Sequence, residues 1–252
     1  MELVTHGLEL RRGEPVLISN LEMAVGPGEI WVVLGPNGSG KSTLLLALAG
    51  VLRPTAGEVL LDGRRLSRWL PAERGERIAW QGSLPSAEFG FKVHERLELV
   101  PSHTRKVKDA LERLDLGPLA GRRLFELSAG ERQRVELAAL WLRDAPVWLL
   151  DEPTTHLDLR HQVSCLDLLR EEARNGRSLI VVLHDLTQAH AIADQALLLR
   201  ADETHQAGPA KELLRPEELE QVFGTRLHVA HGPEESALLP AYHSPDSQRS
   251  HE

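Results

Sequence analysis

Short runs of consecutive apolar residues recur along this chain, separated by stretches with helical spacing. The runs occupy residues 30–34, 147–150, 179–183 and 196–199. A strand that is buried on both faces is apolar throughout, and strands that alternate with helices pair in parallel. Helical spacing from Leu159 to Arg174 and from Leu186 to Ala193 supplies the intervening helices. The pattern predicts an α/β fold whose mainly parallel sheet is covered on both faces.

The remaining segments predict additional elements around that sheet. Alternating apolar and polar positions predict strands, and so do two shorter apolar runs further on; these strands span residues 3–10, 16–25, 57–61 and 77–81. A helix is expected from Lys41 to Leu52, stopped by Pro54. From about residue 82 to 145 the pattern becomes helical, which indicates an inserted helical subdomain. We expect one domain over residues 1–240 and a frayed polar tail over residues 241–252.

Composition restricts the function classes. With 252 residues and 42% hydrophobic content, the chain can bury a sizeable core. No apolar run approaches the roughly 20 residues that cross a bilayer, and the first ten residues lack the apolar centre of a signal peptide, so a cytoplasmic protein is expected. The net charge of −8 argues against a nucleic-acid partner. The single cysteine, Cys165, follows a helical apolar pattern and is expected to pack in the core.

A phosphate-binding motif lies between a predicted strand and a predicted helix. Residues 35–43 have the sequence G-P-N-G-S-G-K-S-T, directly after the apolar run 30–34. Glycines let successive backbone N–H groups turn toward an anion, and the helix that follows directs its positive N-terminus at it. Lys41 adds a point charge, and the hydroxyl of Ser42 is a ligand for the Mg²⁺ that accompanies nucleotide phosphates. The motif predicts an ATP or GTP site.

Polar side chains end three other predicted strands. Asp151 and Glu152 follow the run 147–150, His184 follows the run 179–183, and Gln81 ends an earlier strand. Ligands of open α/β sheets bind at the carboxyl ends of the strands, where these side chains and the phosphate motif are expected to meet. Asp151 is a candidate Mg²⁺ ligand, and Glu152 can orient or deprotonate an attacking water.

Two of these side chains have more than one interpretation. The amide of Gln81 can bind Mg²⁺ or position a water. His184 can reach a γ-phosphate, although a histidine at a strand end is more often a structural, hydrogen-bonded residue.

A second candidate anion site precedes the helix near residue 135. The sequence from Leu127 to Arg134 is L-S-A-G-E-R-Q-R, in which Ser128 and Glu131 have the spacing of a capping box. A capping serine, a glycine and a helix N-terminus together can also bind an anion. Arg132 and Arg134 are expected to form surface or intersubunit salt bridges.

Taken in order, these motifs resemble the nucleotide-binding subunits of ATP-binding-cassette (ABC) transporters. Gly35 to Thr43 matches the phosphate loop, Gln81 the Q-loop, Leu127 to Glu131 the signature, Val147 to Glu152 the Walker B strand, Thr155 to Asp158 the D-loop, and His184 the switch histidine. The resemblance covers roughly residues 3–223. It implies the P-loop NTPase fold of ABC ATPases, in which an antiparallel β subdomain and an inserted helical subdomain accompany the parallel sheet. It also implies ATP and Mg²⁺ as cofactors.

The resemblance also assigns the site residues. Catalytic roles would belong to Glu152, His184 and Gln81, and Mg²⁺ contacts to Ser42, Gln81 and Asp151. Nucleotide contacts would come from Arg11, Gly35, Asn37, Gly38, Ser39, Gly40, Lys41, Ser42, Thr43, Ser128, Ala129, Gly130 and Asp158. Two copies would close head to tail, with each ATP between the phosphate loop of one and Ser128, Ala129 and Gly130 of the other.

Two departures from the family pattern concern the nucleotide. Ala129 stands where the signature usually has a second glycine, which keeps the backbone donor and adds a methyl group. Arg11 stands where an aromatic residue usually stacks on adenine, and a guanidinium can stack on a base in its place.

Within the family, residues 154–162 look most like the ATPases of importers for iron siderophores, haem and cobalamin. That type would dock at the cytoplasmic face of the inner membrane on separate permease subunits and act indirectly with a substrate-binding protein. The sequence does not separate the three cargoes. A soluble assembly ATPase of the cassette type, such as one serving iron-sulfur cluster biogenesis, stays an alternative, and a P-loop kinase would leave residues 127–131 unexplained.

Overall fold

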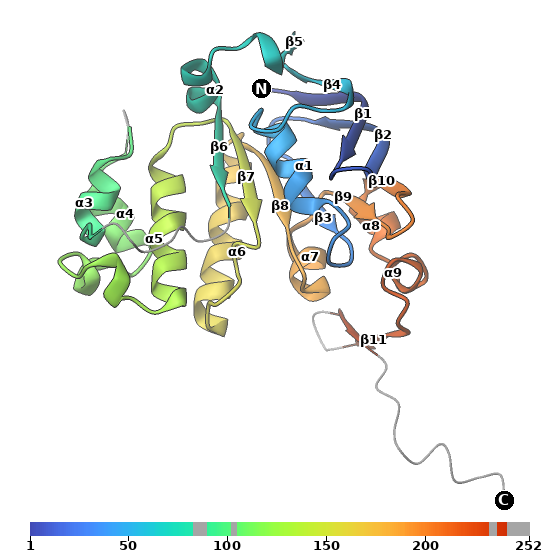
Figure 1. Cartoon of the computed structure of the whole chain (residues 1–252). Coiled ribbons are helices and arrows are strands. Elements are labelled where there is room, and N and C mark those ends of the chain that lie inside the picture. Colours follow the sequence, from blue (N-terminus) through green and yellow to red (C-terminus); the bar gives the residue numbers. More distant parts are fainter. Residues whose placement is uncertain (83–89, 102–104, 232–235, 241–252) are drawn as a thin grey trace, which may run out of the picture.

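A six-stranded sheet forms the centre of the molecule. The computed structural model describes residues 1–82, 90–101, 105–231 and 236–240, with side chains up to residue 227. The strands are β3 (Ile30–Leu34), β6 (Ile78–Gln81), β7 (Val147–Asp151), β8 (Ser178–Val182), β9 (Gln195–Leu199) and β10 (His205–Pro209). Their order is β10-β9-β3-β8-β7-β6 (Figure 1). The strands β9, β3, β8, β7 and β6 are parallel to one another, and β10 runs antiparallel to β9. The predicted mainly parallel sheet is confirmed.

Helices cover one face of this sheet. They are α5 (Ala129–Leu142), α6 (Leu159–Arg174), α7 (Leu186–Ile192) and α9 (Pro216–Phe223), and α3 (Val93–Glu98) and α4 (Val107–Arg113) pack against α5. Their apolar side chains join those of the sheet in one buried cluster, which includes Trp148 and Cys165. Burial raises the pKa of the Cys165 thiol to about 12, so this residue is an unreactive core cysteine, as predicted.

The other face is covered by α1 (Lys41–Leu48) and by a second, antiparallel sheet. That sheet has the order β2-β1-β4-β5 and consists of β1 (Leu3–Arg11), β2 (Val16–Val25), β4 (Ala56–Leu61) and β5 (Arg64–Arg65). Inward side chains of β1 and β2 pack with α1 and with β3 in a second buried cluster. Alternation along these strands therefore has its usual cause, one face packed and one face in solvent.

Smaller elements complete the chain. They are η1 (Leu66–Arg68), α2 (Pro71–Arg77), η2 (Gly117–Leu119), η3 (Leu124–Glu126), α8 (Ala210–Leu213), β11 (Leu227–His231) and β12 (Ser236–Pro240). Our sequence analysis identified none of these, nor β10 and α9. Within the described residues, no helix has both the length and the apolar character needed to span a bilayer.

The helix after the phosphate motif is shorter than predicted. It ends at Leu48, because Gly50 takes a left-handed conformation (φ 69°) and the N–H groups of Val51 and Leu52 both turn back to the carbonyl of Leu46. A glycine just past the last turn ends helices in this way, so Gly50 and not Pro54 is the stop. The polar tail expected at residues 241–252 lies outside the described residues.

A buried carboxylate joins the helical segment to the central sheet. Glu172 on α6 is 1% exposed, and its two carboxylate oxygens both accept from Nη2 of Arg105 at 2.8 Å. The same carboxylate accepts from Nε of Arg177 at 2.7 Å and from the indole of Trp141 at 3.0 Å. Arg105 also lies over the ring of Trp141, 4.2 Å from its centroid. These partners balance the negative charge of the buried Glu172 carboxylate and satisfy its hydrogen bonds.

We expect Glu172→Ala to lower the free energy of unfolding by about 3–5 kcal/mol, because it leaves two half-buried arginines without their counterion. Urea denaturation of the purified chain measures this loss. The adjacent Glu171 is a matched control: it is exposed and ion-paired with Arg113, so Glu171→Ala should cost less than about 1 kcal/mol. Equal losses for the two variants would contradict a special role for the buried carboxylate.

Candidate functional site

The register of the sheet brings the predicted site residues to one edge. Val33 of β3 and Asp151 of β7 both pair with Val182 of β8, so the three strands end at the same level. Gln81, the last residue of β6, pairs with Leu150 of β7. The phosphate motif, Asp151, Glu152 and His184 therefore follow strands that end side by side, at the lower edge of the sheet in Figure 1.

The loop over residues 35–40 turns tightly between β3 and α1. Gly35 has a φ of 156°, and a Cβ atom there would lie 2.5 Å from the carbonyl oxygen of Leu199 and 2.8 Å from the hydroxyl of Ser39. Gly38 and Gly40 also have positive φ values. This conformation needs glycine, because a side chain at Gly35 would collide with the backbone of β9.

Lys41 is buried inside this loop. Its side chain is 7% exposed, and Nζ donates to the carbonyl oxygens of Gly35 (2.8 Å) and Pro36 (2.9 Å). Burial lowers the pKa of the Lys41 ammonium, and the negative charges of Glu152 and Asp151 oppose that shift. The ammonium is thus a cation held at the centre of the loop and facing two carboxylates.

The other residues of the loop surround this cation. Asn37, Gly38 and Ser42 are exposed, Gly40 and Thr43 are half-buried, and Ser39 is buried. Among the described residues the Ser39 hydroxyl has no hydrogen-bond partner. A buried hydroxyl without a partner is costly, which favours a ligand that supplies one.

The general-base candidate Glu152 is held by two neighbours. Its Oε1 lies 2.5 Å from Nε2 of His184, and its Oε2 accepts a hydrogen bond from the hydroxyl of Thr155 at 3.1 Å. The backbone of Glu152 is left-handed (φ 52°), a conformation that costs a non-glycine residue about 1–3 kcal/mol. Such strain is found at functional sites, and here it turns the carboxylate toward His184.

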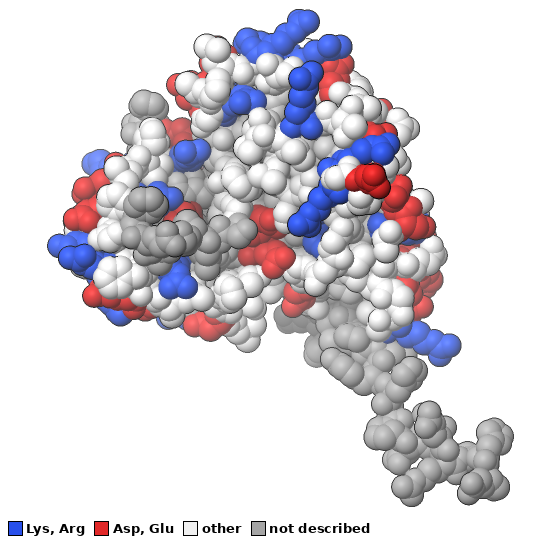
Figure 2. Space-filling view, in the orientation of Figure 1, with Lys and Arg blue, Asp and Glu red and all other residues white. Residues whose placement is uncertain are grey.

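A cavity of about 230 Å³ opens beside these carboxylates. Its lining residues come from four segments of the chain and are Ser42, Gly82, Gln133, Asp151, Glu152, Thr155 and His156. Figure 2 shows acidic atoms in the middle of this face, over the lower end of β7. The structure thus brings Ser42 of the phosphate motif together with both acids, as the sequence predicted.

Gln81 is the most informative of the predicted metal ligands. Its side chain is buried, and neither amide atom has a hydrogen-bond partner among the described residues. With the Ser42 hydroxyl and the Asp151 carboxylate nearby on the same sheet edge, it provides an all-oxygen donor set of the kind that Mg²⁺ prefers. The residues present fit Mg²⁺.

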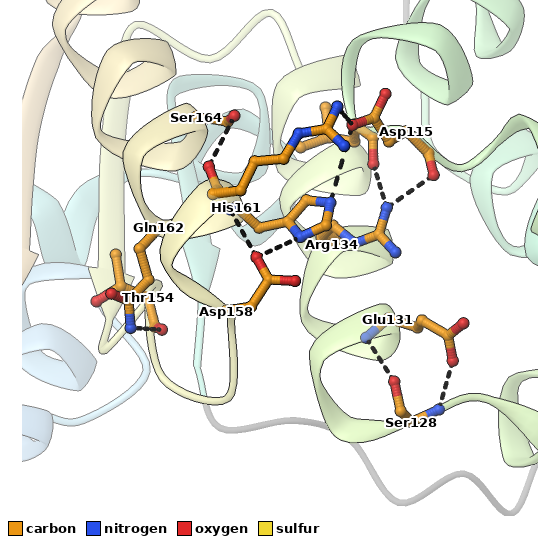
Figure 3. A network of polar contacts seen from close by, with 11 residues as sticks. Asp115, Ser128, Glu131, Arg134, Thr154, Asp158, His161, Gln162 and Ser164 are labelled. Carbon is orange, nitrogen blue, oxygen red and sulfur yellow. Dashed lines mark hydrogen bonds and ion pairs between the residues drawn. The ribbon is translucent and has the colours of Figure 1, made fainter.

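The signature residues form the start of α5. Ser128 is the N-cap: its Oγ accepts from the N–H of Glu131 at 3.2 Å, and the Glu131 carboxylate accepts from the N–H of Ser128 at 2.7 Å (Figure 3). The predicted capping box is confirmed. Among the described residues, no hydrogen bond or ion pair joins Ser128, Ala129 or Gly130 to residues 35–43.

Asp158 caps the next helix, α6. Its Oδ1 accepts from the N–H of His161 at 2.9 Å and contacts Nδ1 of the same histidine at 2.8 Å (Figure 3). These hydrogen bonds lower the pKa of Asp158. The other side of the His161 ring faces Asp115, which also pairs with Arg160. Asp158 is exposed and on the same side of the molecule as the start of α5.

Arg11 ends β1 and lies near the phosphate loop. It pairs in register with Val16, and the next residue, Leu17, is the closest neighbour of Gly40, 3.0 Å from a Cβ atom placed there. The guanidinium is exposed, and it donates to Glu9 at 2.8 Å. The ion pair restrains the guanidinium without covering it.

Two arginines of α5 bind backbone oxygens of their own chain. Arg132 donates to the carbonyl of Leu127 at 2.7 Å, and Arg134 donates to the carbonyls of Leu114 and Asp115. The surface or intersubunit salt bridges expected for these two arginines stay a prediction. The two carbonyls that Arg134 binds follow the end of α4, where backbone acceptors lack helical partners.

Sequence analysis missed Gln133 and Thr155 as members of the site. Gln133 is buried on α5, and its amide donates to the carbonyls of Pro153 (2.9 Å) and Glu152 (3.4 Å). A glutamine that falls on the buried side of an apolar helix is a signal that could have found it. Thr155 stands three residues after Glu152, which is within reach of its carboxylate in a tight turn.

Comparisons with known proteins identify the family of this chain. The family model of ABC transporters matches residues 18–155. The hemin import ATP-binding protein HmuV of Pseudomonas fluorescens (strain Pf0-1) is 41% identical over 245 residues, covering 92% of this chain and 96% of the relative. The HmuV protein of Pseudomonas aeruginosa is 43% identical over 245 residues, with the same two coverages.

A solved structure has a similar fold. It is described as an inward-facing conformation of a metal-chelate type ABC transporter, and it is 27% identical with a TM-score of 0.79 over 95% of this chain and 97% of that chain. An ATP-bound structure of a bacterial Atm1-family ABC exporter, 23% identical with a TM-score of 0.74 over 85% of this chain and 40% of that chain, shows the same fold. The chain therefore belongs to the ABC transporter family and is an ATPase with that family's ATP-binding fold.

Proposed function

We propose that this chain hydrolyses ATP to power the import of a metal chelate through a separate membrane permease. Among the three candidate cargoes we favour haem over iron siderophores and cobalamin. The observation that carries the proposal is the meeting of a phosphate loop, Lys41 and two carboxylates at one sheet edge. Relatives named for hemin import, which match nearly the whole chain, support haem over the other cargoes. The iron-sulfur assembly alternative gains no support from these relatives.

The phosphate loop would bind the triphosphate of ATP. Backbone N–H groups of residues 37–43 face the anion at the start of α1, and Lys41 exchanges its bonds to Gly35 and Pro36 for phosphate oxygens. The hydroxyl of Ser39 gains the partner that it lacks. Arg11 would stack on adenine, because it pairs with Val16, the neighbour of the Leu17 that packs against Gly40, and its guanidinium is exposed.

Asp151 and Glu152 make a second cation necessary. One ammonium does not balance two carboxylates and a triphosphate, so we infer that Mg²⁺ binds with ATP and is held by Ser42, Gln81 and Asp151. The ion supplies charge neutralisation of the phosphate oxygens. Gln81 supports this assignment, because neither polar atom of its buried side-chain amide has a hydrogen-bond partner among the described residues.

Glu152 would act as the general base. Its carboxylate accepts a proton from the water that attacks the γ-phosphate, which requires a free oxygen within hydrogen-bond reach of that water. His184 and Thr155 hold the two oxygens in the structure. His184, exposed and next to Glu152, would then contact the γ-phosphate, and Glu152 would turn one oxygen to the water.

A second copy of the chain would complete the site. Ser128, Ala129 and Gly130 form an N-terminal anion site on α5 that its own phosphate loop does not use, and Asp158 is exposed beside it. We infer a head-to-tail homodimer in which each ATP contacts the loop of one copy and the start of α5 of the other. ATP hydrolysis would reopen it.

The transport partners follow from this role. Relatives of this chain are named for hemin import, so we infer that it docks on permease subunits at the cytoplasmic face of the inner membrane. A substrate-binding protein would act on the far side of the membrane. The sequence places two phenylalanines, Phe89 and Phe91, soon after Gln81, and both are candidate contacts for the permease. Phe91 is exposed, and Phe89 lies outside the described residues. The net charge of −8 argues against a nucleic-acid partner.

Glu152→Gln should slow ATP hydrolysis at least ~100-fold while leaving ATP binding intact, because it removes the proton acceptor and keeps the shape of the site. Steady-state phosphate release measures the rate, and gel filtration with ATP should show the variant as a dimer. The control is Glu203→Gln, since Glu203 is also a left-handed, exposed glutamate but lies in the turn after β9. Wild-type turnover in Glu152→Gln would refute the assignment.

Deletion of the gene should abolish growth on haem as the only iron source and leave growth on an iron salt unchanged. The wild-type gene should restore growth on haem, and the Glu152→Gln gene should not, because transport needs hydrolysis. Growth curves in the organism that carries the gene measure this. Unchanged growth of the deletion strain on haem, with loss of growth on cobalamin or a siderophore instead, would show that the cargo is wrong.

A further inference from the structure

The loop that carries Glu152 is strained at both of its ends. Glu152 has a φ of 52° and His156 a φ of 68°, although neither is a glycine. The loop is closed by hydrogen bonds from Thr155 N to Glu152 O (3.1 Å) and from Leu157 N to Thr154 O (3.3 Å). Two left-handed residues four positions apart persist only if the surrounding structure holds them.

Helix α5 contacts this loop at both strained positions. The buried amide of Gln133 donates to the carbonyls of Pro153 and Glu152, at 2.9 and 3.4 Å. One turn earlier, Gly130 lies so close to the carbonyl of His156 that a Cβ atom would be 2.5 Å from its oxygen. The start of α5 thus packs against the loop at two points, Glu152 and His156.

Gln133 makes the polar contacts between α5 and the loop. It is 3% exposed, and it lines the same cavity as Asp151 and Glu152. Among the described residues, its amide is the only recorded hydrogen-bond donor to the Pro153 carbonyl. From the sheet side, the N–H of Glu152 donates to the carbonyl of Val182 at 3.1 Å. The backbone of Glu152 is therefore held between β8 and α5.

We propose that Gln133 is a positioning residue for hydrolysis: it holds the backbone of Glu152 so that the carboxylate meets the attacking water. The inference rests on the proposed role of Glu152 as general base. It also gives α5 a second task, because the preceding turn of the same helix carries Ser128 and Gly130. When the nucleotide bound by the partner displaces the signature (residues 127–131), the side-chain amide of Gln133 transmits that displacement to Glu152 of the same chain as the signature.

Gln133→Met tests this, because methionine keeps the length of the side chain and removes the donor. We expect kcat for ATP to fall at least tenfold, since small displacements of a reacting group are costly. The dissociation constant for the fluorescent analogue mant-ATP should stay within twofold. Rates are divided by the concentration of binding sites, so that a loss of folded protein does not imitate a loss of catalysis.

A double-mutant cycle separates positioning from packing. In the Glu152→Gln background, single-turnover rates with radiolabelled ATP should not fall further when Gln133→Met is added, because the group that Gln133 positions no longer accepts a proton. An equal tenfold fall in both backgrounds would overturn the proposal. Glu136→Gln is the matched control: Glu136 lies one turn later on α5, pairs with Arg96 at 2.7 Å and has no recorded bond to the loop.

Two further outcomes are decisive. Wild-type kcat in Gln133→Met, with Glu152→Gln inactive, would overturn the positioning role and leave the proposed ATPase mechanism in place. Wild-type kcat in Glu152→Gln would overturn the mechanism itself. Should Gln133→Met fail to fold, Gln133→Glu keeps volume and polarity and replaces the donor by an acceptor, and the same tenfold fall is expected.

Discussion

A buried ammonium group determines the arrangement of this site. Lys41 lies inside the phosphate loop, with two loop carbonyls at hydrogen-bond distance and two carboxylates as its counter-charges. A charge in such a place is stable only if it is paired and hydrogen-bonded. The glycines of the loop, the end of β3 and the acids after β7 satisfy this condition together. ATP binding then exchanges one set of oxygen partners for another.

The parallel sheet makes this possible because its strands end at one level. β3, β8 and β7 are in register at their carboxyl ends, so the phosphate loop, His184 and the two acids converge although they lie far apart in sequence. Helix α5 adds what the sheet does not provide. It contacts the loop after β7 through Gln133 and Gly130, and the same helix presents Ser128 to a second copy. One helix therefore belongs to two sites.

The sequence predicted the parts of this site that depend on local patterns. The phosphate loop, the acids after an apolar strand and the Ser128 capping box are visible in short windows, because spacing and strand ends decide them. The contacts of His184 with Glu152, of Gln133 with Pro153 and of Arg134 with Leu114 join distant segments. Those contacts depend on packing, which no local pattern contains. Helix α1 was overestimated because Gly50 was not recognised as its stop.

The most direct test of the central claim is a crystal structure of the chain with Mg²⁺ and a non-hydrolysable ATP analogue. We predict phosphates at the N–H groups of residues 37–43, Nζ of Lys41 on phosphate oxygens instead of Gly35 and Pro36, and Ser128 of a second copy against the γ-phosphate. An analogue bound elsewhere, with Lys41 still bonded to both loop carbonyls at saturating concentration, would contradict the account.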